Sequence, residues 1–259
     1  MTKVAPAEKT GGINVSAGFR RSDSSIFLDL EFENINSPMP VGNLAIQLNK
    51  NAFSLSPASQ QIVCNPPINT GSKGMASVEL VVNRAMLAPV AEGQPASPQV
   101  QVAIKNMATS TVFYFAANIN LDVLFASDGK MDRTAFIESW KSKNNSNNSM
   151  IYKTESWKSI DDQKEIYSTV SNLPTSSTII EQVQTKLEPR NISFIARRAV
   201  PNAVGQEVAY FSMKTKTGMD FLAEITFKKG VNACKVCVKA ENSSYGLLAK
   251  NAIEGVLRG

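Results

Sequence analysis

The chain contains no histidine and only three cysteines among its 259 residues. Histidine is the commonest general base and metal ligand, so Ser-His-Asp and Cys-His nucleophile systems are excluded. The sequence also lacks a GxxxxGK[ST] phosphate-binding loop, a GxGxxG motif after a strand, and an acidic cluster suited to a metal ion. We therefore expect neither a cofactor nor a metal, and an enzyme that works without histidine is the least favoured class.

Long hydrophobic runs are also absent. The longest apolar stretches, Val112–Ala117 and Val123–Ala126, are far too short to span a bilayer. The N-terminal sequence MTKVAPAEKTGG has no apolar core of the kind found in secretory signals. We interpret residues 1–11 as a flexible leader or linker.

The cysteines do not form a recognisable framework. An odd number of cysteines in a chain of this size argues against a set of disulfides and for a reducing compartment. Cys234 and Cys237 have CxxC spacing, but the surrounding sequence NACKVCVKAE alternates like a strand. Residues three apart on a strand point to opposite faces. We therefore predict one core cysteine and one outward cysteine rather than a redox or zinc site.

Charge is low and dispersed. The net charge is +5, with 19% charged and 43% hydrophobic residues. A nucleic-acid-binding surface usually gathers lysine and arginine into a stripe with interleaved aromatics, whereas here the basic residues are spread along the chain. We do not expect nucleic acid as a partner, although a basic module that binds anionic lipid or nucleic acid is kept as an alternative.

The first half of the sequence reads as strands. INVSAGF and IFLDLEF alternate apolar and polar residues on either side of the polar turn RRSDSS, which predicts a hairpin. Further alternating runs follow, separated by segments rich in Pro, Gly, Asn and Ser. Many short alternating strands without an intervening helical period indicate an antiparallel sandwich. We predict an all-β, immunoglobulin-like β-sandwich subdomain over residues 12–124.

The pattern changes after Asp128-Gly129. Helical periods are expected at the segment that Asp132 opens, at residues 159–172 with Ser159 as the cap, near residues 176–187, and at the C-terminus. Four strand-like runs lie between the last two helices. We therefore predict an α+β unit over residues 125–259, an α/β platform subdomain with an antiparallel sheet and flanking helices.

The segment FIESWKSKNNSN contains Trp140, one of only two tryptophans. On a helical wheel Phe136, Ile137 and Trp140 form an ordinary apolar stripe. Arg133 falls inside the same stripe, which is unusual because a buried unpaired guanidinium is costly. The pattern alone therefore favours a core stripe that includes Ile137 and Trp140. It leaves open the alternative that the stripe is buried at Phe136 and Ile137 but opens to solvent near Arg133 and Trp140.

The segment FYFAANINLDVLFASDGKMDRTAFIESWKS resembles the beta-adaptin appendage (ear) of clathrin adaptor complexes, whose pattern is an aromatic-rich strand followed by LxxLFxEDGxMeRxxFLxxWK. LAIQLNKNAFSLSP, VQVAIKN, FIARRAVPNAVGQEVAYFSMK and FLAEITF also resemble the family's motifs, in order along nearly the whole chain. The resemblance implies a sandwich followed by a platform. It also implies a non-enzymatic role.

The resemblance also implies particular binding residues, matched one by one. The family's platform groove is built around a tryptophan–lysine pair, with arginines, a tyrosine and a glutamate near it. The matching platform residues are Trp140, Lys141, Arg133, Arg198, Tyr210 and Glu224. A second peptide site on the sandwich centres on a tyrosine that matches Tyr114. The family's glutamate shortly after the Trp-Lys pair has no counterpart in SKNNSNNS.

The expected partners follow from the same resemblance. They are short linear motifs in endocytic accessory proteins and cargo adaptors, clathrin, and the rest of the adaptor complex, which is reached through a hinge that lies outside this chain. The ear itself is expected to be monomeric and to meet membranes only indirectly. The expected location is cytoplasmic, peripheral on clathrin-coated pits and vesicles at the plasma membrane or at trans-Golgi and endosomal membranes.

Overall fold

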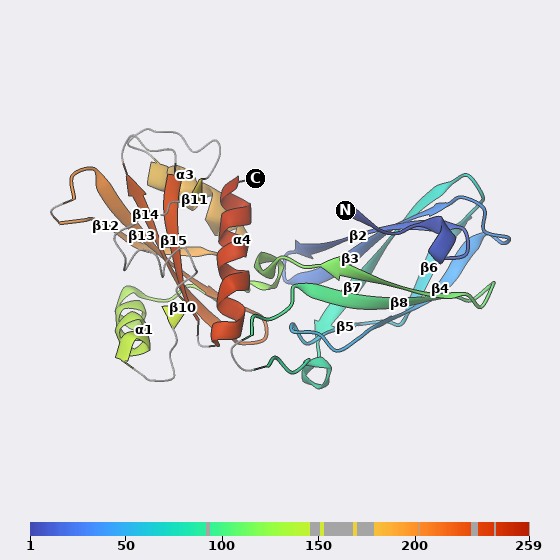
Figure 1. Ribbon diagram of the computed structural model, residues 1–259, viewed down its shortest axis with the longest axis horizontal. Coiled ribbons are helices and arrows are strands. Elements are labelled where there is room, and N and C mark those ends of the chain that lie inside the picture. Colours follow the sequence, from blue (N-terminus) through green and yellow to red (C-terminus); the bar gives the residue numbers. More distant parts are fainter. Residues whose placement is uncertain are drawn as a thin grey trace. The chain divides into compact units, whose positions relative to one another are not determined.

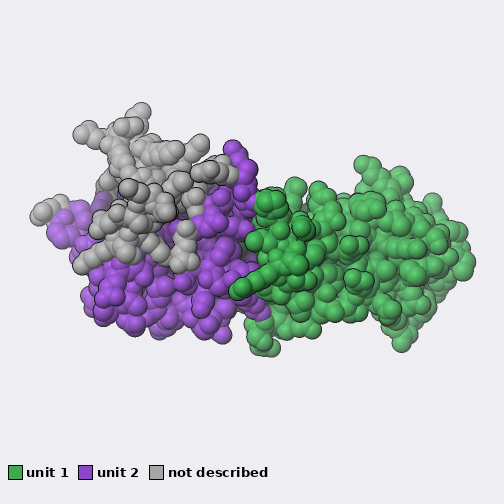
Figure 2. Space-filling model, turned by 90° about the horizontal axis from the view of Figure 1, so that it is seen from below, with its two compact units in different colours: residues 1–89, 97–123 green, residues 90–96, 124–259 purple. Residues whose placement is uncertain are grey.

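A computed structural model of the chain describes residues 1–91, 94–145, 151–152, 168–169, 179–201, 203–228, 233–240 and 242–258. The chain divides into two compact units, residues 1–89 with 97–123 and residues 90–96 with 124–259 (Figure 2). The boundary expected after residue 124 lies one residue from the one observed. Residues 90–96, expected in the sandwich, belong instead to the second unit, where Ala96 N donates to Ser244 O at 2.8 Å.

The first unit contains two antiparallel sheets (Figure 1). The five-stranded sheet consists, in spatial order, of β1 (Thr2–Ala5), β2 (Ile13–Ser22), β3 (Ser25–Asn34), β7 (Lys73–Val82) and β5 (Leu55–Pro57). The four-stranded sheet consists of β6 (Gln61–Ile68), β4 (Val41–Leu48), β8 (Gln99–Asn106) and β9 (Val112–Asn118). Alternate residues of these strands are buried, as the period-two pattern predicted. The predicted sandwich is confirmed.

The N-terminal segment is part of this sheet. Thr2 to Ala5 pair with β2, and Thr10 is buried with its hydroxyl accepting a hydrogen bond from Ile13 N at 3.2 Å. The prediction that residues 1–11 form a flexible leader is therefore wrong where β1 forms. An edge strand draws its stability from backbone pairing and needs little apolar sequence, so hydropathy did not reveal it.

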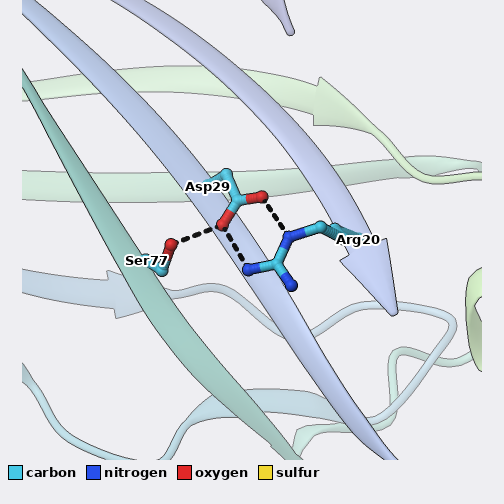
Figure 3. A network of polar contacts seen from close by, with 3 residues as sticks. All are labelled: Arg20, Asp29 and Ser77. Atoms are coloured by element: carbon cyan, nitrogen blue, oxygen red, sulfur yellow. Dashed lines mark hydrogen bonds and ion pairs between the residues drawn. The ribbon is translucent and has the colours of Figure 1, made fainter. Parts of the chain in front are cut away.

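A polar network ties three strands together on the outer face of the five-stranded sheet (Figure 3). Arg20 Nε lies 2.7 Å from Asp29 Oδ2, and Ser77 Oγ donates to Asp29 Oδ1 at 2.6 Å. The hydrogen bond from Arg20 is the main reason that the pKa of the Asp29 carboxyl is lowered, with Ser77 adding to it and partial burial opposing it. The carboxylate is thus held charged at the centre of the network.

The second unit is built on one antiparallel sheet. Its main path, in spatial order, is β10 (Ile151–Tyr152), β15 (Ala233–Ala240), β14 (Asp220–Lys228), β13 (Gln206–Lys214) and β12 (Ser193–Ala199), and β11 (Ser168–Thr169) also pairs with β15. The α-helices of the described residues are α1 (Arg133–Asn145), α3 (Ile179–Leu187) and α4 (Gly246–Arg258). Considering both units together, short 3-10 helices occur at Ala7–Lys9, Arg84–Met86, Leu121–Leu124, Glu188–Arg190 and Ser243–Tyr245. The predicted platform is confirmed.

Helices cover both faces of this sheet. Cys234 lies on the face that carries α4. The charge of Glu254 on that helix is close enough to add to the effect of burial, which raises the pKa of the Cys234 thiol. Tyr210, Glu224 and Cys237 are paired across neighbouring strands on the opposite face, against which α1 packs (Figure 1). The prediction of one outward cysteine is therefore wrong, since Cys234 and Cys237 are both buried. Burial also raises the pKa of the Cys234 thiol to about 12, which keeps it protonated and unreactive near neutral pH.

The other predicted elements have mixed outcomes. The helices near residues 176–187 and at the C-terminus, and the four strands between them, are confirmed. The helix predicted over residues 159–172 is wrong at its end, because Ser168 and Thr169 form β11. Ser159 and most of the rest of that segment lie outside the described residues. Among the described helices, none combines the length and the hydropathy that crossing a membrane requires.

Candidate functional site

The site is organised around α1, whose start is fixed by local capping. Asp132 Oδ1 accepts hydrogen bonds from Thr134 N at 2.9 Å and Ala135 N at 3.0 Å. This satisfies two of the donors that a helix N-terminus leaves free. Phe136, one turn further on, is only 4% exposed and anchors the helix to the sheet.

The loop before α1 is pinned to strand β13 by a buried hydroxyl. Ser212 Oγ donates to Gly129 O at 2.8 Å and accepts from Met131 N at 3.0 Å. Gly129 itself has no room for a side chain, because a Cβ there would lie 2.6 Å from Lys214 N. The Asp128-Gly129 turn therefore sets the distance between α1 and the sheet.

Three aromatic rings meet between α1 and β13. Phe136 and Trp140 are stacked, with centroids 5.7 Å apart and ring planes at 16°. The Tyr210 ring forms edge-to-face contacts with both, at centroid distances of 5.7 Å from Phe136 and 5.8 Å from Trp140. Phe136 is buried beneath the other two, while Trp140 and Tyr210 are half-buried and keep part of their surface in solvent.

These rings border an open pocket of about 350 Å³. Helix α1 contributes Arg133, Phe136, Ile137 and Trp140; β12 contributes Ile195, Ala196, Arg197 and Arg198; β13 and β14 contribute Tyr210 and Glu224. The wall is thus aromatic and aliphatic, with three arginines and one glutamate among its lining residues. A concave apolar site with a few charged groups is the usual form of a ligand-binding pocket.

Two charged residues of the pocket, Arg198 and Glu224, are linked through Tyr210. Arg198 Nε donates to the Tyr210 hydroxyl at 2.9 Å, and the guanidinium lies 5.8 Å from the ring centroid. Burial is the main cause that raises the pKa of Tyr210; the charge of Glu224 adds to it and Arg198 opposes it. Tyr210 is therefore neutral at physiological pH and retains a hydroxyl for hydrogen bonding.

Lys239 supports the pocket from within the sheet. Its side chain is almost fully buried, and Nζ donates to the main-chain oxygen of Trp140 at 2.9 Å. The same ammonium lies 3.8 Å from the centroid of the Trp140 ring, a cation–π contact. Sequence reasoning missed this residue. Alternation along β15 places Lys239 on the face of Tyr210, but a lysine in an alternating strand usually indicates the solvent side.

The structure brings together most of the predicted platform residues. Arg133, Trp140, Arg198, Tyr210 and Glu224 line the same pocket. The backbone of Lys141 continues α1, but its side chain is outside the described part of the chain.

The role predicted for Ile137 is wrong. Its side chain is 41% exposed and faces the pocket, so Phe136 alone of the pair is buried against the sheet. A helical wheel places both residues on one stripe, but only the fold decides which edge of that stripe meets the sheet. Sequence reasoning also missed Ile195 and Ala196, which lie beside the predicted Arg198 on β12.

Tyr114 lies in the other unit, on the outer face of β9. Its side chain is 72% exposed, while Phe113 and Phe115 are buried in the sandwich core. Tyr114 is paired with Ala103 of β8, whose small side chain leaves the ring uncovered on that side. An uncovered tyrosine beside an alanine offers an aromatic surface to a partner.

Comparison with known proteins places this architecture in a family. The family described as "Beta2-adaptin appendage, C-terminal sub-domain" matches residues 154–257. The chain is 31% identical over 229 residues to human AP-1 complex subunit beta-1, covering 88% of this chain and 21% of that protein. It is 31% identical over 253 residues to the rat AP-1 complex subunit beta-1, covering 98% of this chain and 23% of that protein.

A more distant relative shows the same extent of match. The AP-1 complex subunit beta of Dictyostelium discoideum is 25% identical over 232 residues, which cover 90% of this chain and 22% of that protein. The chain thus spans about a fifth of the length of the curated relatives that it matches. Together with the sandwich and the platform, these matches show that the chain is a beta-adaptin appendage domain.

Proposed function

We propose that this chain is the protein-interaction appendage of a clathrin adaptor beta subunit and has no catalytic role. It captures short peptide motifs of accessory proteins and cargo adaptors in vesicle-mediated transport, and it contributes to clathrin binding. The observation that carries this proposal is the pocket between α1 and β12, where Trp140 and Tyr210 expose aromatic surface beside Arg133 and Arg198. Rigid aromatic side chains combined with arginine are typical of binding hot spots.

The charge and shape of the pocket favour a particular peptide. A short amphipathic helix places apolar anchors at i, i+3 or i+4, which suits a groove with flat aromatic walls. Arg133 and Arg198 attract an acidic residue upstream of the anchors, while Glu224 attracts a basic residue downstream of them. The resemblance to the appendage family implies a ligand of the pattern acid–Phe–x–x–Phe/Leu–x–x–x–Arg, and this arrangement of charges fits it. One such motif binds with roughly micromolar affinity, about −8 kcal/mol, and several motifs act together through avidity.

An NMR titration of the labelled chain with this peptide tests the platform site. Shifts are expected around Trp140 and Tyr210, and the variant Trp140→Ala is expected to lose binding. Tyr114→Ser is the matched control, since it removes an exposed aromatic in the other unit and leaves the pocket intact. If Trp140→Ala binds the peptide as well as the unmodified chain, the platform assignment fails.

Tyr114 is proposed as the centre of a second peptide site on the sandwich. The supporting observation is its large exposed ring beside Ala103. Fragments of accessory proteins that carry aromatic motifs are titrated against the variant Tyr114→Ser. The variant Trp140→Ala, which alters the platform and leaves Tyr114 in place, serves as the control. Unchanged binding of every fragment to Tyr114→Ser contradicts the second site.

Location and wider assembly follow from the same proposal. The appendage acts in the cytoplasm, joined to the adaptor core and held at coated pits or vesicles of the plasma membrane, trans-Golgi or endosomes. Binding to anionic vesicles or nucleic acid with a steep salt dependence, and without preference for the peptide motif, would instead favour the alternative of a basic lipid- or nucleic-acid-binding module.

A further inference from the structure

Strand β12 is the outermost strand of the platform sheet (Figure 1). In the part of the chain that the structure describes, its backbone pairs with β13 and with no strand on its other side. Alternate N–H and C=O groups of such an edge strand point away from the sheet and are available to another chain. Proline, which would block pairing, is absent from Ser193–Ala199.

The pocket reaches this free edge. Four consecutive residues of β12, from Ile195 to Arg198, line it. The pairing of β12 with β13 is irregular between Phe194 and Ala196, and this bulge places Ile195 on the same face as Ala196. Arg197 points to the opposite face because side chains alternate after the bulge, yet it also lines the pocket. The pocket therefore meets β12 at its edge, and a ligand seated there lies beside the backbone of this strand.

The side chains of the edge define what pairs with it. Arg197 and Arg198 are exposed next to each other, whereas Ala196 and Ala199 are small and leave the backbone accessible. Arg197 is bound to Glu181 of α3, whereas the polar partner of Arg198 within the described part of the chain is the neutral Tyr210. Arg133 adds a further positive charge to the same pocket. This edge thus favours an acidic chain.

A second copy of this protein is a poor occupant of the edge. Antiparallel pairing of two β12 strands would bring the adjacent arginines of both copies close together. Like charges facing each other across strands are destabilising, and charged side chains are a known device against edge-to-edge association. The same arginines attract an acidic partner.

We propose that an acidic, extended segment adjoining the anchor motif adds to β12 as a further antiparallel or parallel strand of the platform sheet. The inference rests on the proposed peptide-binding function and extends it. The anchor residues occupy the pocket, and the acidic residues upstream of them run along the edge with backbone hydrogen bonds to β12. Recognition then depends on backbone geometry as well as on charge.

Backbone N-methylation of the peptide separates these contributions, because it removes one N–H donor and leaves every side chain and charge unchanged. Peptides with the anchor motif and five upstream acidic residues are methylated at one upstream position at a time. An added strand presents only every second N–H to β12, so the affinity should alternate along the series. Affected positions should lose about five- to tenfold and the intervening positions much less.

Hydrogen exchange of the protein supplies an independent measurement. Alternate amides from Ile195 to Ala199 should be protected when the peptide binds, and less so with a peptide methylated at a sensitive position. The inference is overturned if N-methylation has no alternating effect and β12 amides gain no protection, while Trp140→Ala still abolishes binding. That result would leave the proposed function intact. If Trp140→Ala also has no effect, the proposed function fails, and a concentration-dependent dimer in sedimentation would assign the edge to a second copy.

Discussion

Lys239 holds Trp140 by two contacts from one ammonium group. Nζ donates to the main-chain oxygen of Trp140 at 2.9 Å and lies 3.8 Å from the centroid of its ring. The two residues are 99 positions apart in the chain. A buried side chain of the sheet therefore fixes both the backbone and the ring of the residue at the centre of the proposed peptide site.

Replacing Lys239 by methionine keeps a long apolar stem and removes the ammonium. We expect Lys239→Met to lower the free energy of unfolding by about 1–2 kcal/mol, because a charge-assisted hydrogen bond and a cation–π contact are lost. The fluorescence of Trp140 should also change, measured with Trp157 replaced by phenylalanine. Lys105→Met, the same change at an exposed position of strand β8, is the control in urea denaturation. Equal effects of the two variants would contradict this role for Lys239.

Ser212 is expected to fix the position of α1, and so the shape of the pocket, without contacting the ligand. Ser212→Ala leaves Gly129 O and Met131 N without the hydroxyl that now joins them. A buried group that loses its partner costs about 1–3 kcal/mol, and the start of α1 should shift. Isothermal titration calorimetry should show weaker binding of the anchor peptide. Ser193→Ala, at the paired position on β12, serves as the control; normal binding to Ser212→Ala would show that the loop holds its position by other means.

Asn51 stabilises the sandwich through four backbone groups. Nδ2 donates to Asn49 O and Leu55 O at 2.9 Å, and Oδ1 accepts from Phe53 N and Leu55 N. Because the side chain is buried, we expect Asn51→Ala to lower the free energy of unfolding by about 3 kcal/mol.

Asn83→Ala provides the comparison for Asn51. Its side chain is exposed and accepts one hydrogen bond, from Ala85 N, so we expect a loss below about 1 kcal/mol. Chemical denaturation of both variants measures the difference. A similar small loss in both would mean that water replaces the contacts of Asn51.

The Arg20–Asp29 pair should make the stability of the sandwich sensitive to acid. The folded-state pKa of Asp29 lies below its unfolded value, mainly through the hydrogen bond from Arg20. The pair therefore contributes stability above the unfolded pKa, and this contribution is lost as pH falls through the folded pKa. Melting temperatures of Asp29→Asn should therefore fall less steeply as the solution is acidified. In an Arg20→Met background the Asp29 substitution should make little further difference to the slope, and an unaltered slope in the single variant would refute the assignment.

The strands of the sandwich could be predicted from sequence because each has one buried face and one solvated face. The alternation in INVSAGF and IFLDLEF corresponds to the hairpin of β2 and β3, with Ile13 to Ser22 paired to Asn34 to Ser25. In the platform, alternation did not reveal that Cys237 and Lys239 are buried, because helices cover both faces of the sheet. Alternation then separates two faces but does not say which one meets water.

The proposed site was predictable only in part. Trp140, Arg133, Arg198, Tyr210 and Glu224 were identified through motifs, and Arg133 also through its discordant place in an apolar stripe. Ile195 and Ala196 carry no comparable signal, since a strand residue beside a pocket looks like any half-buried strand residue. The position of β12 at the edge of the described sheet depends on the order of the strands, which local sequence patterns do not encode.

The class of each unit, most strands and helices, and the residues that resemble a peptide-binding ear could be predicted without the structure. These features follow from local periodicity and short motifs, which act over a few residues. Tertiary packing was needed to show that Ile137 faces the pocket, that Lys239 is buried beneath Trp140, that residues 2–5 join a sheet, and that β12 is the last described strand of the platform sheet. Those outcomes depend on contacts between segments far apart in the chain, where the geometry of packing rather than local pattern selects which surface is covered.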